Sequence, residues 1–182
     1  MTFSETGLNK NIQKAITDLG FETPTPIQQE SIPYLLENET DLIALAQTGT
    51  GKTAAFGLPV LHKIDVERKL PQAIILCPTR ELCLQIAKDM ESFAKYTKGL
   101  KITAVYGGAS ITPQIKSLKS GTQIVVGTPG RVIDLINRKA LRLQDIEFVV
   151  LDEADEMLNM GFKDDLDTIL AETPEEKQTL LF

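Results

Sequence analysis

Cysteine and histidine are scarce in this sequence. Its 182 residues include two cysteines, Cys77 and Cys83, and a single histidine, His62. Two cysteines cannot form a disulfide framework, and their spacing from each other and from the histidine fits no zinc-binding pattern. We therefore expect two small buried thiols, and we expect His62 to lie on a helix at the surface or at the boundary of the core.

Long apolar runs are also missing. None approaches the roughly 18 residues of a membrane-spanning helix, and residues 1–5 show no basic region followed by an apolar stretch. These absences argue against a membrane span and a secretory signal, so we expect a cytoplasmic location and no membrane partner. Hydrophobic residues make up 42% of the chain and charged residues 24%, which is the balance of a folded domain with a full core.

Positive charge and large aromatic side chains are limited too. The net charge is −6, and the chain has 7 phenylalanines, 3 tyrosines and no tryptophan. A protein that binds nucleic acid through broad charge would be basic, and a single-strand channel built on stacking would be rich in aromatics. Any nucleic-acid binding must therefore use a few local groups, or basic segments outside these residues.

Short apolar runs alternate with helical patterns along the chain. Most of the runs are continuously apolar, which is typical of strands that are buried on both faces of a parallel sheet. The alternation predicts an α/β domain with a mostly parallel central sheet and helices on both of its faces. The expected strands are residues 42–46, 73–77, 102–106, 123–127, 148–151 and 179–182.

The first part of the chain shows helical patterns only. Its apolar residues Leu8, Ile12, Ile16 and Leu19 fall at helical spacing. Gly20 is placed to end this helix, and Pro26 to begin a second one. We divide the chain into an N-terminal helical region, residues 1–36, and an α/β domain, residues 37–182.

A glycine-rich loop, Ala46–Thr53, follows the first expected strand and precedes a helix. Its glycines allow successive N–H groups to point at phosphate oxygens, Lys52 adds a positive charge, and Thr53 offers a hydroxyl to Mg²⁺. The standard pattern begins with glycine, and this loop begins with alanine. The predicted nucleotide contacts are Ala46, Gln47, Thr48, Gly49, Thr50, Gly51, Lys52 and Thr53.

An acidic stretch, Asp152–Asp155, follows the fifth expected strand. Beside a phosphate loop, Asp152 would hold Mg²⁺ through water, and Glu153 would orient or deprotonate the attacking water. Alone, the stretch could equally be an acidic helix start. Together with the loop it predicts an NTPase with Lys52, Asp152 and Glu153 as catalytic residues, without indicating which base is bound or which work is done.

The two motifs resemble those of the DEAD-box family of ATP-dependent RNA helicases, and most closely its bacterial cold-shock members. The resemblance covers nearly the whole chain. Further stretches are similar to the family's other motifs in the same order: Gly20-Phe21 with residues 24–28 to the Q motif, residues 78–82 to motif Ia, Gly107-Gly108 to the GG element and residues 128–131 to motif Ib.

The resemblance implies a base pocket. Gln28 would read adenine through its amide, which can both donate and accept a hydrogen bond, and would favour ATP over GTP. Phe3 and Phe21 would help to form this pocket. The expected cofactors are ATP and Mg²⁺.

The resemblance also implies a site for the RNA backbone. Loop N–H groups, hydroxyls and guanidinium groups suit phosphates without reading the bases, so a few of them can bind a strand on an acidic domain. Ala154 and Asp155 would couple this domain to a second one. The implied RNA-binding residues are Pro78, Thr79, Arg80, Gly107, Gly108, Thr128, Pro129, Gly130 and Arg131.

In the family, a second RecA-like domain with arginines that complete the ATP site would follow. Motif III would come directly after Phe182. We therefore expect a first RecA-like domain that binds ATP–Mg²⁺ and one face of RNA, is monomeric, and is nearly inactive alone because hydrolysis and unwinding need the second domain. The carboxyl end of the last strand should face the same edge as Lys52 and Asp152.

Two alternatives remain open. The protein could be an ATP-controlled RNA clamp that does not usefully unwind, with the same site residues. It could also be another P-loop ATPase, such as a DNA translocase or a transporter motor, although the signature loop of the transporter motors is not found.

Overall fold

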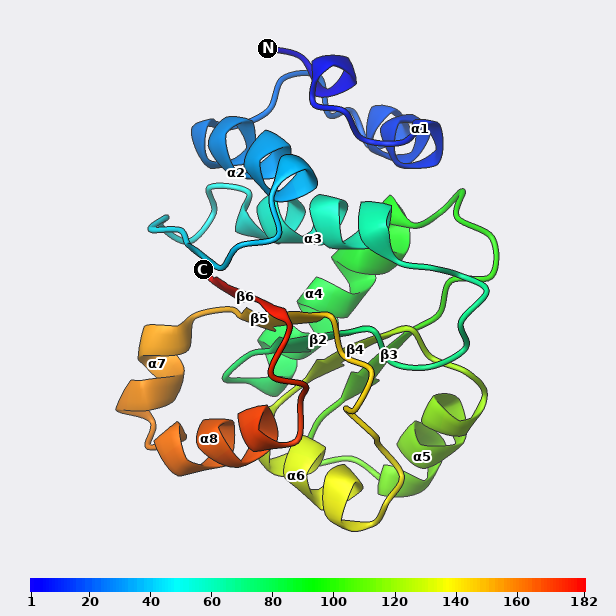
Figure 1. Cartoon of the computed structure of the whole chain (residues 1–182), viewed down its shortest axis with the longest axis vertical. Helices are drawn as coiled ribbons and strands as arrows, with labels where there is room; N and C mark the ends of the chain where they lie inside the picture. The colour runs from blue at the N-terminus through cyan, green and yellow to red at the C-terminus, as the bar shows by residue number, and fades with distance from the viewer.

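The computed structural model describes all 182 residues, and its centre is a six-stranded sheet in which every neighbouring pair is parallel. The strand order is β1-β6-β5-β2-β4-β3 (Figure 1). The expected α/β domain with a parallel sheet is confirmed. The strands are β1 (Leu42–Ile43), β2 (Ala73–Leu76), β3 (Ile102–Val105), β4 (Ile124–Gly127), β5 (Phe148–Leu151) and β6 (Gln178–Leu181).

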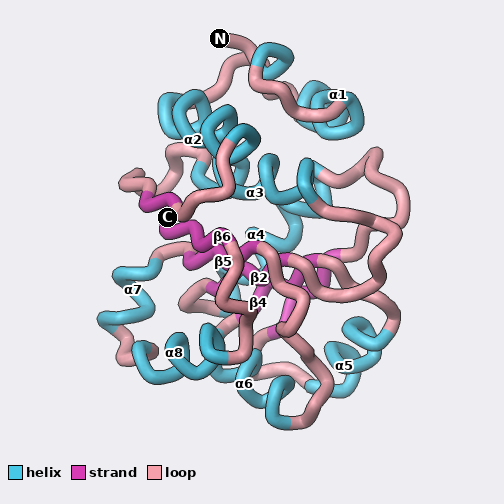
Figure 2. Tube along the Cα trace, viewed as in Figure 1, coloured by secondary structure: helices cyan, strands magenta, loops and turns pink.

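Helices cover both faces of this sheet (Figure 2). Helices α3 and α4 lie on one face, with α1 and α2 stacked beyond them, and α5, α6, α7 and α8 lie on the other (Figure 1). No helix combines the length and hydropathy needed to cross a bilayer. The helices are α1 (Lys10–Asp18), α2 (Pro26–Glu37), α3 (Lys52–Lys63), α4 (Arg80–Phe93), α5 (Ile111–Lys119), α6 (Pro129–Asn137), α7 (Ala154–Asn159) and α8 (Lys163–Ala171), with a 3-10 turn at Phe3–Glu5.

The continuous apolar runs are explained by the two packed faces. Along β2, Ile75 points into the cluster with α3 and α4, whereas Ile74 and Leu76 point into the cluster with α6, α7 and α8. Because successive side chains of a strand point to opposite faces, a strand covered on both sides needs apolar residues at every position.

Strand β1 is shorter than expected. Only Leu42 and Ile43 pair with β6, and the last contact is the N–H of Ala44 with the carbonyl of Leu181. The following Leu45 is 93% exposed. The chain leaves the sheet here and enters the phosphate loop.

The N-terminal helices join the same core as the sheet. Ile12 and Ile16 of α1 are fully buried within the cluster formed by α3 and α4, whereas Leu19 is 45% exposed and lies outside the buried face that the spacing predicts. Gly20 ends the first helix at a φ of 79°. Helix α2 begins at Pro26 and ends at Glu37, so the proposed division after residue 36 falls in its last turn.

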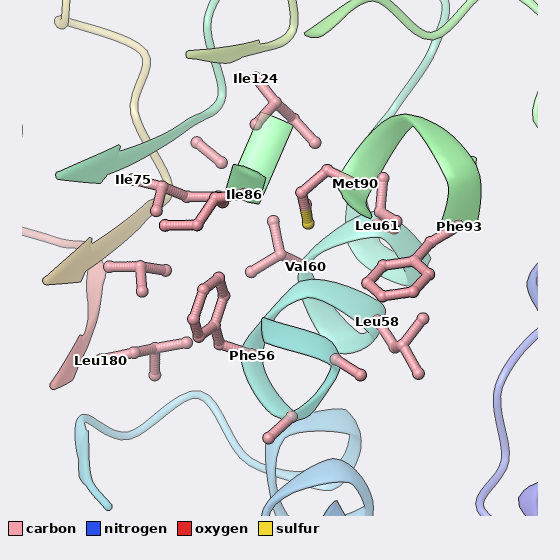
Figure 3. Packing of buried hydrophobic residues seen from close by; sticks show 14 of the residues in the cluster. Phe56, Leu58, Val60, Leu61, Ile75, Ile86, Met90, Phe93, Ile124 and Leu180 are labelled. Carbon is pink, nitrogen blue, oxygen red and sulfur yellow. The ribbon is translucent and has the colours of Figure 1, made fainter. Parts of the chain in front are cut away.

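Helix α3 is buried around most of its circumference. Figure 3 shows Phe56 and Val60 directed toward the sheet, and Leu58 on another side of the helix, near Phe93 of α4. Gly57 permits this close packing, because a Cβ there would lie 2.5 Å from the sulfur of Met90. A helix held this firmly fixes the position of its N-terminus, which carries Lys52 and Thr53.

The scarce residues are structural, as expected. Cys77 and Cys83 are both buried. His62 lies on α3 and is half-buried, and its Nδ1 accepts a hydrogen bond from the N–H of Asn9 at 3.1 Å. Burial lowers the pKa of His62.

Candidate nucleotide and nucleic-acid site

The predicted site residues lie at one edge of the sheet. All six strands run in the same direction, so the loops that follow β1, β2, β4 and β5 emerge together. These loops carry the phosphate loop, Thr79, Thr128 and Asp152. Phe182, at the end of β6, lines a hollow of about 750 Å³ together with Lys52 and Glu153, so the expectation about the last strand is confirmed.

The phosphate loop has the backbone that its glycines predict. Gly49 and Gly51 have φ angles of 81° and 84°, which side chains resist. Gly51 is also the residue from which α3 begins, so the N–H groups of the first turn of this 12-residue helix face the same edge. The N–H donors of the loop and the side chain of Lys52 thus lie at the same edge of the sheet, where together they could bind the negative oxygens of a phosphate group.

Lys52 and Asp152 meet at the centre of the site. Their Nζ and Oδ1 atoms are 3.7 Å apart, and both side chains are largely buried. Burial raises the pKa of Asp152 to about 6, and the charge of Lys52 opposes this rise only in part. The Oδ1 atom has no hydrogen-bond partner. A buried carboxylate oxygen without a donor leaves a position beside it for a water molecule or a cation.

The donor set fits Mg²⁺ in the company of phosphates. The unpartnered Oδ1 of Asp152 and the residue Thr53 border one cavity. No group of three or more acidic, histidine or cysteine side chains is arranged to hold a metal ion by itself. Mg²⁺ commonly uses one or two carboxylates together with water and substrate phosphates, so the single carboxylate suits it.

Glu153 has a strained backbone. Its φ and ψ of 56° and 49° are left-handed, which is uncommon for a residue other than glycine. Its N–H donates to the carbonyl of Phe182 at 2.8 Å. The ring of Phe182 packs edge-on against Phe56 of α3, with the centroids 5.2 Å apart. The backbone of Glu153 is therefore held by the residue that follows β6, and that residue packs against α3.

A cavity of about 420 Å³ brings the predicted nucleotide residues together. It is bordered by Phe21, Gln28, Lys52, Asp152 and Glu153, with Thr48, Gly49, Gly51 and Thr53 of the loop. The sequence reasoning missed its other wall, which includes Leu19, Leu82, Gln85, Asp89, Ser92 and Phe93. Gln85 and Asp89 are one helical turn apart on α4, and their hydrogen bond of 2.8 Å could have been suspected from that spacing.

Gln28 lies at this cavity with its amide already in contact with protein. Its Oε1 accepts from the N–H of Thr25, and its Nε2 donates to the carbonyl of Gly51, both at 3.0 Å. Thr25 also donates to the carbonyl of Thr50 at 2.9 Å. An amide has two donor hydrogens and two acceptor lone pairs, so one of each remains for a ligand. Gln28 thus supports the phosphate loop, and its contact with adenine stays a prediction.

Four other predicted nucleotide residues lie outside this cavity. Phe3 is only 5% exposed and packs behind Phe21, with the ring centroids 5.9 Å apart, so it supports the wall and does not reach the cavity. Thr50 donates its hydroxyl to the carbonyl of Gln47 and so shapes the loop. Ala46 and Gln47 border the adjoining hollow at the end of β6 instead.

That hollow also contains the residues expected to couple the domains. Ala154 and Asp155 border it, together with the exposed Ile43 and Leu45 beside β1. Their coupling role stays a prediction.

A second cavity, of about 460 Å³, gathers most of the predicted RNA-binding residues. Pro78, Arg80, Gly107, Thr128, Pro129, Gly130 and Arg131 border it. Thr79 lies beside it and accepts from the N–H of Leu82 at the start of α4, and Gly108 accepts from Arg80 at 3.4 Å. The sequence reasoning missed Asp134 and Phe162 at this cavity. Phe162 comes from the turn between α7 and α8, a position that no local pattern connects to the other residues.

Known proteins show the same fold and motifs. Residues 25–182 match the DEAD/DEAH box helicase family. The chain is 57% identical over 180 residues to the ATP-dependent RNA helicase CshA of Listeria monocytogenes, which covers 99% of this chain and 34% of the relative. It is 54% identical over 182 residues to the ATP-dependent RNA helicase DeaD of Haemophilus influenzae, which covers 100% of this chain and 30% of the relative.

A solved structure supports the match. A DEAD box protein from the hyperthermophile Methanococcus jannaschii superposes with a TM-score of 0.95 at 49% identity, over 100% of this chain and 49% of that one. The chain thus spans about a third of the length of the two curated relatives. On the matched motifs, the fold and these identities, the chain belongs to the DEAD/DEAH box helicase family.

Proposed function

We propose that this chain is the ATP-binding part of an ATP-dependent RNA helicase and that it carries one face of the RNA site. The observation that carries the proposal is the cavity where Lys52 and the unpartnered, buried Asp152 meet, with Gln28 and Glu153 at its border. The same proposal places the protein in the cytoplasm, where ATP and RNA both occur.

The residues divide the work of phosphoryl transfer. Loop N–H groups and Lys52 would hold the outer phosphates, and Thr53 and Asp152 would hold Mg²⁺, which when bound neutralises phosphate charge. Glu153 would accept a hydrogen bond from the attacking water and align it with the terminal phosphate. Glu153 stands directly before α7 in a left-handed backbone conformation, and its side chain makes no capping hydrogen bond to that helix.

RNA would bind at the second cavity through its backbone. Arg80 and Arg131 supply guanidinium groups there, and the loops of Gly107 and Gly130 permit a close approach of phosphates. These donors recognise phosphates and not bases, so we expect little sequence preference.

Hydrolysis and strand separation would need a second domain that closes on both cavities. The larger relatives motivate this part of the proposal, since the chain covers 30% and 34% of them. Without an arginine supplied by that domain, the hydrolysis rate would be lower by about 10³–10⁵. Alone, the chain should therefore bind ATP weakly and turn it over negligibly.

We expect Glu153→Gln to keep MgATP binding, whereas Lys52→Ala should weaken it at least about tenfold, because Lys52 would contact the phosphates directly and Glu153 would contact only the attacking water. Binding of a fluorescent ATP analogue to the 182-residue protein, with and without Mg²⁺, measures both. Equal affinity of Lys52→Ala and the parent would contradict the proposal.

An ATP-controlled RNA clamp is the second candidate, and the intact Lys52, Asp152 and Glu153 are compatible with it. The two differ in the release of a short RNA duplex. A helicase separates the duplex faster than a clamp, which only retains the RNA while ATP is bound.

A further inference from the structure

Gln114 of α5 lies beside the second cavity and belongs to none of the motifs. It is 7% exposed, and buried glutamines require partners for both ends of the amide. The hydrogen bonds of its side chain go to Arg131, a predicted RNA-binding residue, and to Tyr106, which directly precedes the GG element.

The first partner is the loop after β3. The Oε1 of Gln114 accepts from the N–H of Tyr106 at 3.4 Å, and its Nε2 donates to the carbonyl of the same residue at 3.2 Å. The side-chain amide thus pairs with the backbone as a neighbouring strand would, at the residue where β3 has ended. Gly107 and Gly108 follow directly, so this pairing fixes where the GG element leaves the sheet.

The second partner is Arg131 of α6. Its Nη1 donates to the Oε1 of Gln114 at 2.9 Å, and its Nη2 donates to the carbonyl of Ala109 at 3.0 Å. These two bonds hold the guanidinium by one side, and the remaining donors are left for a ligand at the cavity that Arg131 borders. Without them, a long and flexible side chain would have to be ordered by RNA itself, which costs side-chain entropy.

Arg80 of α4 holds the loop from the other direction. Its guanidinium lies 5.0 Å from the ring centre of Tyr106 and donates to the carbonyl of Gly108. Side chains from α4, α5 and α6 therefore all contact the loop of residues 106–109. Of these side chains, Gln114 is the one that bonds both to the loop and to Arg131.

We propose that Gln114 is a positioning residue for RNA binding. It does not border the cavity itself. It presets the GG element and Arg131 in one arrangement, so that both meet the phosphate backbone without rearrangement. This inference rests on the proposed function.

A chimera provides the test. In it, this chain replaces the matching third of the Listeria relative, and binding of labelled single-stranded oligouridine RNA is measured by anisotropy with a non-hydrolysable ATP analogue. Gln114→Met keeps the side-chain size and removes all three hydrogen bonds, and we expect about five- to tenfold weaker RNA binding. ATP binding without RNA should not change.

Two further measurements separate positioning from stability. The salt dependence of RNA binding should fall by about 0.7 in log–log slope, as expected for one lost phosphate contact on a single strand. Adding Arg131→Ala to Gln114→Met should weaken binding by less than the product of the two single losses, because both changes affect the contact of Arg131 with RNA.

Gln123→Met is the matched control. Gln123 is fully buried and makes three amide hydrogen bonds, to the backbone of Lys101, Val66 and Gly99, at the amino end of β4. It should lower stability without weakening RNA binding. If Gln114→Met does not fold, Gln114→Glu keeps an acceptor for Arg131, and its carboxylate should weaken RNA binding at least as much by competing with phosphate for the guanidinium.

Several results would overturn the inference: unchanged RNA affinity in the folded Gln114 variants, multiplied losses in the double variant, or an equal loss in Gln123→Met. If the parent chimera binds no RNA, the proposed function itself fails. These two failures are therefore distinguishable.

Discussion

At the scale of single residues, the site depends on two energetically unfavourable features that lie next to each other. Asp152 has a buried oxygen without a partner, and Glu153 has a left-handed backbone. Each costs stability unless the surroundings compensate, and such costs concentrate at functional sites. Phe182 compensates for the second through its carbonyl, whereas Lys52 compensates for the first only in part.

Asp152→Asn should therefore stabilise the nucleotide-free protein. Because the folded state raises the pKa of Asp152 from 3.8 to about 6, ionisation of this residue opposes folding. Below pH 4 the variant and the parent should have equal stability. As the pH rises to 6 the parent should lose about 1–3 kcal/mol relative to the variant, and above pH 6 the difference should stay constant. Urea unfolding of both proteins between pH 4 and 7 measures this difference.

Asp152→Asn should also lose MgATP binding, so the substitution that stabilises the nucleotide-free protein removes its proposed function. A parent that is more stable than Asp152→Asn at pH 7 would show that Lys52 outweighs burial at this carboxylate.

Gln28→Ala distinguishes the two roles of the Q-motif glutamine. If the free donor and acceptor of its amide read adenine, the affinity for ATP should fall about tenfold more than the affinity for GTP. If its bonds to Thr25 and Gly51 are its whole role, both affinities should fall equally. Competition of ATP and GTP against a fluorescent analogue, in parent and variant, decides between them.

The site residues that belong to a contiguous sequence motif could be predicted from the sequence. Lys52 and Asp152 lie where the two motifs place them, because a phosphate loop and an acidic residue at the ends of parallel strands must meet at one edge. Gln114 and Phe162 were missed, because their importance comes from contacts with segments distant in the sequence. Phe3 was placed at the cavity itself, and its burial behind Phe21 depends on how the N-terminus packs.

At the scale of elements, strand and helix types were predictable and their ends were not. The six strands occur where apolar runs predict them, since burial on both faces leaves no other pattern. The early end of β1 comes from the exit of the chain into the phosphate loop, and the spacing of the apolar residues does not indicate where that exit lies.

Helix α1 offers a test of whether residues 1–36 fold independently. Ile16 is fully buried in the cluster that also contains side chains of α3 and α4. Ile16→Ala should cost about 2–5 kcal/mol and lower the stability of the whole chain, with one unfolding transition. Tyr34 lies in α2, and Tyr96 and Tyr106 lie outside residues 1–36. If the chain unfolds as one unit, the near-ultraviolet circular dichroism of these tyrosines should change at the same urea concentration as the helical signal. Two separate transitions would show that the N-terminal region unfolds by itself, and exposed Thr17→Ala is the matched control.

At the scale of the whole molecule, the negative charge is unevenly distributed. Residues 152–177 contain ten acidic and two basic residues, whereas the rest of the chain contains 15 acidic and 17 basic residues. The net charge of −6 therefore comes from α7, α8 and their loops. The expectation that broad charge cannot hold RNA rests on the net charge of the whole chain, which does not show this uneven distribution. Arg80 and Arg131 lie outside residues 152–177, in the part of the chain that has two more basic than acidic residues.

In the proposed function, this chain supplies the ATP site of an RNA-dependent ATPase. ATP hydrolysis by the Listeria chimera, with single-stranded RNA or DNA added and with GTP as a comparison, tests it most directly. We predict at least about tenfold stimulation by RNA, little by DNA, loss of turnover in Glu153→Gln, and negligible turnover by the 182-residue chain alone. Brisk RNA-stimulated turnover by the chain alone, or equal stimulation of the chimera by DNA and RNA, would contradict the account.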